Sequence, residues 1–252
     1  MEWYLYLLAI FGGFFAGIIN TLAGNGSAIT LTILSEFMGL PGNVANGTNR
    51  LGIFCQGTVS SFIFYKNDKL HLGRSKGMIA LIVLGALAGV YVATQVSNEQ
   101  FRTVFRYLLV VMFFVIIIRP KRWLRAHSDT DFRLHPLLAV PAYLALGFYG
   151  GFIQMGMGVI FLAVTVLLAR YSLVEANAVK LFTVTLYTLP VLLIFWWQGL
   201  VHWPVALALT AGQVIGAYLT STYASHDPRA NVWAHRLLIV AVLLGIAKAF
   251  FG

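Results

Sequence analysis

Two glycine-rich segments are the features of this sequence that most clearly suggest chemistry. Gly24-Asn25-Gly26-Ser27 and Gly156-Met157-Gly158 each interrupt a long apolar stretch. Each glycine weakens a helix by roughly 1 kcal/mol relative to alanine, so both stretches are predicted to break there. A helix that restarts after a break points unpaired N–H groups and its positive dipole end toward the gap. We therefore expect the two segments to hold an anion between them.

The alternative is that these glycines only allow helices to pack closely. Close packing uses glycines four residues apart on one helix face, as at Gly85 and Gly89. The glycines at 24 and 26 are two apart, with Asn25 between them, which is more typical of a turn.

Two basic residues, Arg50 and Lys180, lie in regions that are otherwise apolar. They occupy nearly matching positions in two similar halves of the chain, one position out of register. A cation inside a membrane is either paired or available to an anion. The alternatives are that both side chains extend to the membrane surface, or that they pair with Glu36 and Glu175.

Neutral polar residues, Gln56 and Tyr187 among them, gather around the same places. Such groups could donate hydrogen bonds to an oxyanion. The alternative for each is a bond to a neighbouring helix backbone, and for Ser27 an N-cap. The expected substrate-binding residues are Asn20, Thr21, Gly24, Asn25, Gly26, Ser27, Thr48, Asn49, Arg50, Gln154, Gly156, Gly158, Lys180 and Thr183.

Other chemistries find little support. No acidic residue lies in the middle of a predicted span, so no buried carboxylate relay is expected. The single cysteine, Cys55, excludes an internal disulfide and a Cys-based zinc site. The P-loop and H-E-x-x-H motifs are absent, and we expect no catalytic residue, metal or cofactor. An enzyme using Ser27 as nucleophile would need a nearby base, but the histidines fall in loops or near segment ends.

The amino-acid composition indicates what kind of structural element positions these residues. Of the 252 residues 60% are hydrophobic and 10% charged, against about 45–50% and about 25% in soluble domains. The chain is thus expected to be an all-α, multi-pass membrane protein, and its location the bacterial cytoplasmic (inner) membrane. A span needs roughly 20 helical residues. The predicted spans are 77–98, two within 181–226, and shorter runs at about 45–65, 103–118 and 235–251.

The stretches 3–35 and 134–169 are too long for one span and too short for two. We expect each to form a re-entrant hairpin of two half-helices joined at its glycines. Hairpins leave 13 of the 17 Lys and Arg residues on one side, which the positive-inside rule makes cytoplasmic. Full crossing of both segments gives a weaker bias. The net charge of +9 then needs no nucleic-acid partner.

The two halves of the chain resemble each other. At an offset of 131, Ala45-Asn46 matches Ala176-Asn177 and His71 matches His202, both histidines being expected where helices begin. With hairpins, the halves have opposite orientations. The expected fold is two inverted repeats, each a re-entrant hairpin plus three transmembrane helices: residues 1–118 and 134–252, joined by a basic cytoplasmic linker at 119–133.

This order of features resembles the sulfite exporter TauE/SafE family, also called the toluene sulfonate uptake permease family. The resemblance rests on Ala16-Gly17 followed by Gly24-Asn25-Gly26-Ser27, then Leu40-Pro41 and Ala45-Asn46-Gly47-Thr48-Asn49, and it covers nearly the whole chain. Asn49 and Lys180 depart from the family pattern. The resemblance implies secondary transport of small anions, often sulfur oxyanions or organosulfonates.

The expected function is therefore a secondary transporter for a small anion, with sulfite or a sulfonate as the leading choice. It would work by alternating access at a site between the two broken helices. The alternatives are a channel-like facilitator for the same anions, or a membrane scaffold or assembly factor that transports nothing. The expected partners are a small anion and the lipid bilayer, and a homo-oligomer is compatible with the sequence.

Overall fold

The structure is a computed structural model that describes residues 2–22, 24–117, 135–223 and 228–251. Within these ranges the regular structure is helical, and no strand is present. The expected linker at 119–133 lies outside them. The elements of the first half are α1 (Trp3–Leu22), α2 (Gly26–Thr32) with a π-helical turn (Ile33–Phe37), α3 (Gly42–Lys66), a 3-10 turn (Gly73–Ser75), α4 (Lys76–Gln95) and α5 (Asn98–Ile117).

The second half contains the same kinds of element in the same order. The two short helices have 7 residues each and both continue into a π-helical turn of 5. The long helices that follow them, α3 and α8, have 25 residues each. The elements of this half are α6 (Pro136–Phe152), α7 (Met157–Ala163) with a π-helical turn (Val164–Leu168), α8 (Leu173–Trp197), α9 (Trp203–Thr222) and α10 (Pro228–Phe251).

Both predicted breaks are present. The chain leaves α1 at Leu22 and restarts at Gly26, with Gly24 at φ +75°. It leaves α6 at Phe152, slightly before the expected glycines, and restarts at Met157. Helix α2 packs against α1, and α7 packs against α6, so each break is followed by a short helix in contact with the one before it. The π-helical turns then widen the end of each returning arm.

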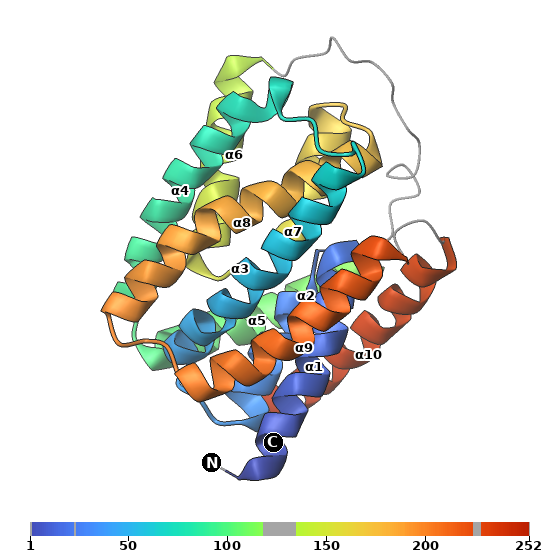
Figure 1. The fold of residues 1–252 in the computed structure, drawn as a ribbon. Helices are drawn as coiled ribbons and strands as arrows, with labels where there is room; N and C mark the ends of the chain where they lie inside the picture. The colour runs from blue at the N-terminus through green and yellow to red at the C-terminus, as the bar shows by residue number, and fades with distance from the viewer. Residues whose placement is uncertain (1, 23, 118–134, 224–227, 252) are drawn as a thin grey trace.

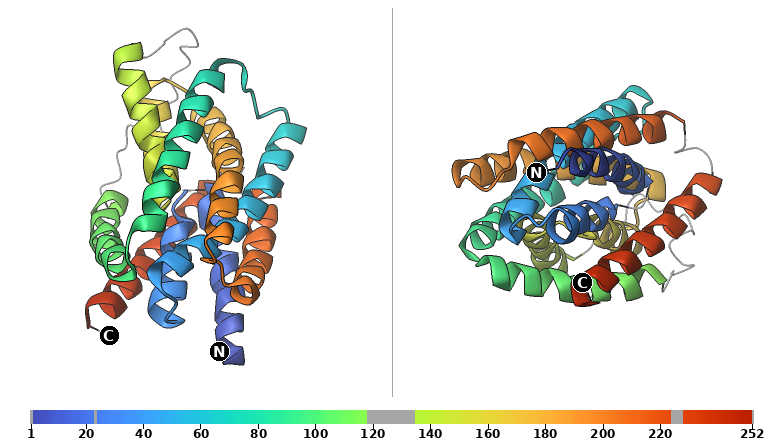
Figure 2. Two further views of the ribbon diagram at one scale, coloured as in Figure 1. Left: turned by 90° about the vertical axis from the view of Figure 1, so that its left-hand side faces the viewer. Right: turned by 90° about the horizontal axis from the view of Figure 1, so that it is seen from below.

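The hairpins approach each other from opposite ends of the molecule (Figure 1). The chain enters α1 at the end where both termini lie, and enters α6 at the other end. Figure 2 shows the termini at one end in a second view, with α5 and α10 packed together beside the hairpins. Each hairpin tip therefore lies in the interior of the molecule.

Each hairpin packs on a helix of the other half: α1 on α9, and α6 on α4. A Cβ added at Gly85 would lie 2.2 Å from the Leu144 carbonyl oxygen, and one at Gly89 would lie 2.1 Å from that of Phe148. Glycines four apart therefore bring these backbones together, as the spacing predicts. The glycines that make these approaches are Gly85, Gly89, Gly147 and Gly151 between α4 and α6, and Gly13, Gly17, Gly212 and Gly216 between α1 and α9.

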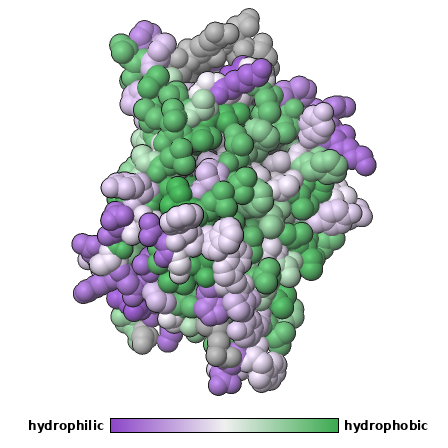
Figure 3. All heavy atoms as spheres, turned by 60° about the vertical axis from the view of Figure 1, so that its left-hand side comes forward, coloured by the Kyte–Doolittle hydropathy of each residue, from purple (hydrophilic) through white to green (hydrophobic). Residues whose placement is uncertain are grey.

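Four helical stretches in the described ranges are long and apolar enough to cross a membrane: Trp3–Leu22, Gly73–Gln95, Leu173–Trp197 and Trp203–Thr222. Helix α3 is as long as α8 but more polar, because it carries Arg50 and several amides that are buried inside the protein. Apolar side chains cover the middle of the face in Figure 3, and hydrophilic residues gather at its edges. Trp196, Trp197 and Trp203 are exposed near the α8–α9 turn, where an interfacial aromatic belt is expected.

Candidate functional site

The two hairpin tips meet through glycine backbone. The Gly158 N–H donates to the Gly24 carbonyl oxygen at 3.1 Å. A Cβ at Gly24 would lie 2.6 Å from the Gly158 Cα, and a Cβ at Gly158 would lie 2.4 Å from the Gly24 Cα. Only glycine fits at both positions, because the opposing atoms are backbone atoms that cannot swing aside. The glycine breaks therefore both turn the chain and join the two hairpins.

We expect Gly158→Ala to destabilise the protein by about 2–3 kcal/mol, because it forces the two tips apart. The melting temperature in detergent measures this. Gly77→Ala is the matched control, since a Cβ at Gly77 meets nothing within 4 Å. A melting temperature for Gly158→Ala equal to that of the control would show that the tips separate without cost.

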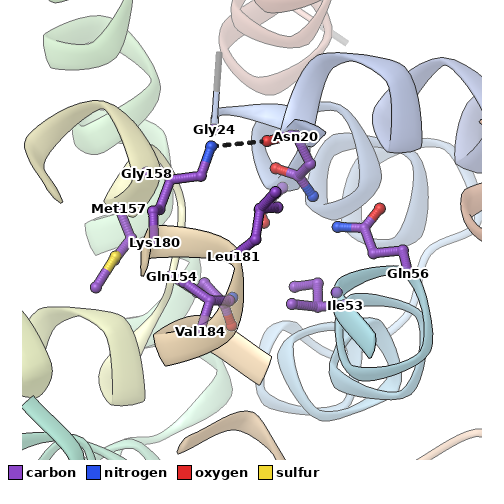
Figure 4. Close-up of a pocket in the computed structure, with 12 residues that line it drawn as sticks. Asn20, Gly24, Ile53, Gln56, Gln154, Met157, Gly158, Lys180, Leu181 and Val184 are labelled. Carbon is purple, nitrogen blue, oxygen red and sulfur yellow. Dashed lines mark hydrogen bonds between the residues drawn. The ribbon is translucent and has the colours of Figure 1, made fainter. Parts of the chain in front are cut away.

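A pocket with about 360 Å³ of empty space, including part of its opening, lies beside the tips (Figure 4). Both hairpins and both long helices α3 and α8 contribute to its wall. No acidic or histidine side chain is among the described residues that line it. The lining residues are Asn20, Gly24, Ser27, Ile53, Gln56, Gly57, Gln154, Met157, Gly158, Lys180, Leu181 and Val184.

Lys180 is the cation of this pocket. Its side chain is 2% exposed and comes from α8. The ammonium donates to the Asn20 backbone oxygen at 3.1 Å, the dashed contact in Figure 4, and to Asn177 Oδ1 at 2.6 Å. An ammonium has three N–H donors, so these two neutral acceptors leave one for the pocket.

Asn20 links Lys180 to the start of the returning helix. Its backbone oxygen accepts from Lys180, while its Oδ1 accepts from the Gly26 N–H at 2.7 Å. The first N–H of α2 is thus satisfied within the protein, as is the Gly158 N–H by Gly24. The expectation that these backbone groups are free for a ligand does not describe this conformation.

Arg50 lies elsewhere, under the end of α6. Its guanidinium donates to the Gly150 and Gly151 carbonyl oxygens at 2.8 and 2.9 Å and to Asn46 Oδ1 at 3.0 Å. It also donates to Gln154 Oε1. Arg50 is fully buried but is not among the residues that line the pocket. Its hydrogen bonds satisfy the last carbonyls of a helix, which otherwise lack partners.

Neither buried cation pairs with Glu36 or Glu175, and neither extends to the surface. Glu175 pairs with Arg74 at 2.9 Å, and Glu36 lies 3.6 Å from Arg102. Both alternatives raised from the sequence are therefore wrong in this conformation. Within the described part of the chain, the buried cations contact neutral oxygen atoms.

The other expected site residues fall into four groups, of which three are described first. Asn20, Gly24, Ser27, Gln154 and Gly158 line the pocket with Lys180. Thr21 and Thr183 donate to the backbone of their own helices, which is the alternative considered for them. Thr48 accepts from the His202 N–H at 2.9 Å, and the His202 side chain caps the start of α9 as expected.

Asn25, Gly26, Asn49 and Gly156 complete the set. Neither polar atom of the Asn25 side chain has a partner among the described residues, although the residue is fully buried against the tip at Gly156. Asn49 Nδ2 is also unpartnered, and its Oδ1 lies 3.4 Å from Gln213. Asn25 is the N-cap of α2 and Ser27 is not, so the proposed capping role of Ser27 is wrong.

Gln56 was a candidate hydrogen-bond donor but is missing from the list of expected binding residues. The other lining residues missing from that list are Ile53 and Gly57 from α3, and Met157, Leu181 and Val184 from the second half. The spacing of residues along a helix could have predicted some of these lining residues. Residues three and four apart share a helix face, so Gln56 and Gly57 follow Ile53, and Val184 follows Lys180. Gln56 Oε1 is buried at the pocket wall, and no residue in the described ranges gives it a hydrogen bond.

A family model for the sulfite exporter TauE/SafE proteins matches residues 9–249. The chain belongs to this family. It is 27% identical over 248 residues to the probable membrane transporter protein ORF9 of a Sinorhizobium species, covering 98% of this chain and 93% of that protein. It is 29% identical over 209 residues to the probable membrane transporter protein YfcA of Escherichia coli K12, covering 82% and 76%. No solved structure matches significantly.

A third relative, a probable membrane transporter protein of Haemophilus influenzae, is 28% identical over 211 residues and covers 82% of this chain and 80% of its own. Membership in the TauE/SafE family and the apolar helices make this an integral membrane protein. The names of its relatives point to a membrane transporter rather than an enzyme.

Proposed function

We propose that this TauE/SafE protein is a secondary transporter for a small anion, with sulfite or an organosulfonate as the expected substrate, in the bacterial cytoplasmic membrane. The observation that carries the proposal is Lys180, a buried cation at the wall of the pocket between the hairpins. Its hydrogen-bond acceptors in the described part of the chain are neutral. The family description and the bacterial relatives named as transporters support the class of function.

The pocket wall favours an anion with one charged end. Lys180 supplies the positive charge, and Asn20, Ser27, Gln56 and Gln154 supply neutral polar groups. Because no carboxylate lines the pocket among the described residues, nothing there compensates the ammonium. Ile53, Met157, Leu181 and Val184 make part of the wall apolar, which suits a small organic group attached to the charged end.

Alternating access of two inverted repeats is the transport mechanism that we propose. The matching order of elements in the two halves supports it, as do hairpins that enter from opposite ends. Each hairpin packs on a helix from the other half, so movement of one repeat changes the contacts of both. Of the expected site residues, we propose that those lining the pocket contact the anion, and that Arg50, Thr21, Thr48 and Thr183 support the helices.

The test is the melting temperature of the purified protein against sulfite, thiosulfate, sulfoacetate, taurine, sulfate, phosphate and acetate at constant ionic strength. A ligand bound only by the folded state stabilises it by about 2.7 kcal/mol at a hundredfold excess over Kd. We expect a sulfur-containing anion to raise the melting temperature, and the same anion to enter proteoliposomes with saturable counterflow. Uptake without counterflow would indicate a channel. No shift and no uptake with any of the anions would contradict the proposal and favour a scaffold.

A further inference from the structure

An asparagine and a basic residue on one long helix donate hydrogen bonds to the end of each long hairpin arm, which is α6 or α1. On α3, Asn46 Nδ2 donates to the Phe152 carbonyl oxygen at 2.7 Å while Arg50 holds Gly151. On α8, Asn177 Nδ2 donates to the Thr21 carbonyl oxygen at 3.1 Å. Lys180 holds the preceding carbonyl of α1, as Arg50 does for α6. Each clamp, meaning Asn46–Arg50 or Asn177–Lys180, thus joins a long helix to the hairpin of the other half.

The two clamps differ in how firmly their cations are held. The Arg50 guanidinium is planar and rigid, and it makes contacts with four acceptors. The Lys180 side chain is flexible, and its ammonium donates to two acceptors. Of the two cations, Lys180 lines the pocket and Arg50 does not. An anion in the pocket therefore reaches the cation of one clamp and not of the other, first through the N–H that is left free, and then attracts the ammonium away from its two neutral acceptors.

Asn20 connects Lys180 to the α1–α2 hairpin. Lys180 contacts its backbone oxygen, and its side chain contacts the first N–H of α2. A full negative charge attracts the ammonium more strongly than a carbonyl dipole does. When the ammonium turns toward an anion, the last turn of α1 and the start of α2 lose a charge-assisted contact.

We infer that anion binding loosens the α1–α2 hairpin by drawing Lys180 from Asn20, with Asn177 as its positioning residue, while the Arg50 clamp keeps the α6–α7 hairpin in place. This inference rests on the proposed function, because it needs an anion in the pocket. It assigns unequal roles to two clamps that are built alike, and makes one hairpin the moving element.

The test is hydrogen–deuterium exchange of the detergent-purified chain, with and without sulfite or sulfoacetate, read on residues 17–28 and 147–160. We expect saturating anion to speed exchange in 17–28 by roughly tenfold and to leave 147–160 unchanged. Without anion, Asn177→Ser should speed exchange only in 17–28. The matched variant Asn46→Ser should speed it only in 147–160. Lys180→Arg should keep exchange in 17–28 slow whether or not anion is present.

Melting temperatures of the same samples distinguish failure of this inference from failure of the proposed function. An anion that raises the melting temperature but slows or does not change exchange in 17–28 overturns the inference and leaves the proposed function intact. Equal loosening of both segments by the anion also overturns it. If neither anion nor any other member of the panel raises the melting temperature and none enters proteoliposomes, the proposed function fails, and the inferred loosening of the α1–α2 hairpin fails with it.

Discussion

Lys180→Met is expected to lower anion uptake into proteoliposomes by about 100-fold. The substitution keeps an unbranched side chain, one atom shorter, but removes the ammonium that lines the pocket. A hydrogen bond to a charged group contributes about 1.5–3 kcal/mol, and each 1.4 kcal/mol is a factor of ten in affinity. The measurement is initial uptake of the anion with the largest thermal shift, as a function of its concentration.

The matched control is Lys248→Met, which removes one positive charge from an exposed position near the end of α10. We expect it to keep at least half of the uptake, so that a general effect of net charge is separated from a local one. The anion should also stop raising the melting temperature of Lys180→Met. Uptake by that variant equal to the control would show that Lys180 does not bind the transported anion.

Arg50→Met is expected to lower the free energy of unfolding by about 3 kcal/mol, because it leaves buried acceptors without a donor. The acceptors are the last carbonyls of α6 and the side chains of Asn46 and Gln154. Arg50→Lys should recover only part of the loss, because an ammonium has three donors and lacks the planar fork of Arg. Melting temperature and the monodisperse yield from detergent measure both variants.

Lys248→Met is the control for Arg50 as well. Lys248 is exposed near the end of α10, so its substitution removes one positive charge from the surface. Substitutions of this kind typically change the free energy of unfolding by less than about 0.5 kcal/mol, so little loss is expected. If Arg50→Met melts at the temperature of this control, the hydrogen bonds under α6 do not stabilise the fold. The anion should still stabilise any Arg50 variant that folds, because Arg50 does not line the pocket.

The two glycine breaks and the helical, membrane-spanning character of the chain could be predicted from local features. Consecutive apolar residues, glycine spacing and charge placement act through neighbouring residues, and these are visible in the sequence. Helix α3 shows the limit of this approach. Its composition is less apolar than that of a typical span, because Arg50 and its amides face other helices rather than lipid.

The roles of the two buried cations could not be separated from the sequence. Arg50 and Lys180 occupy nearly matching positions, and both were expected to bind the anion. Each contacts the end of a hairpin arm, but Lys180 also lines the pocket and Arg50 does not. In the sequence, Asn46 and Asn177 could be recognised only as matching positions of the two halves. Their contacts with the hairpins depend on how the two halves pack together.

The sequence by itself determined a family of membrane proteins, the two points where helices break, and a set of polar residues around them. Tertiary structure alone decided which of these groups remain available to a ligand. The reason is that a hydrogen-bonding group buried in an apolar interior takes whatever partner lies nearest. For Gly26, Gly158, Thr48 and Arg50 that partner is another part of the chain. Lys180 also has such partners, but it lies at the wall of the pocket, where a ligand can reach it.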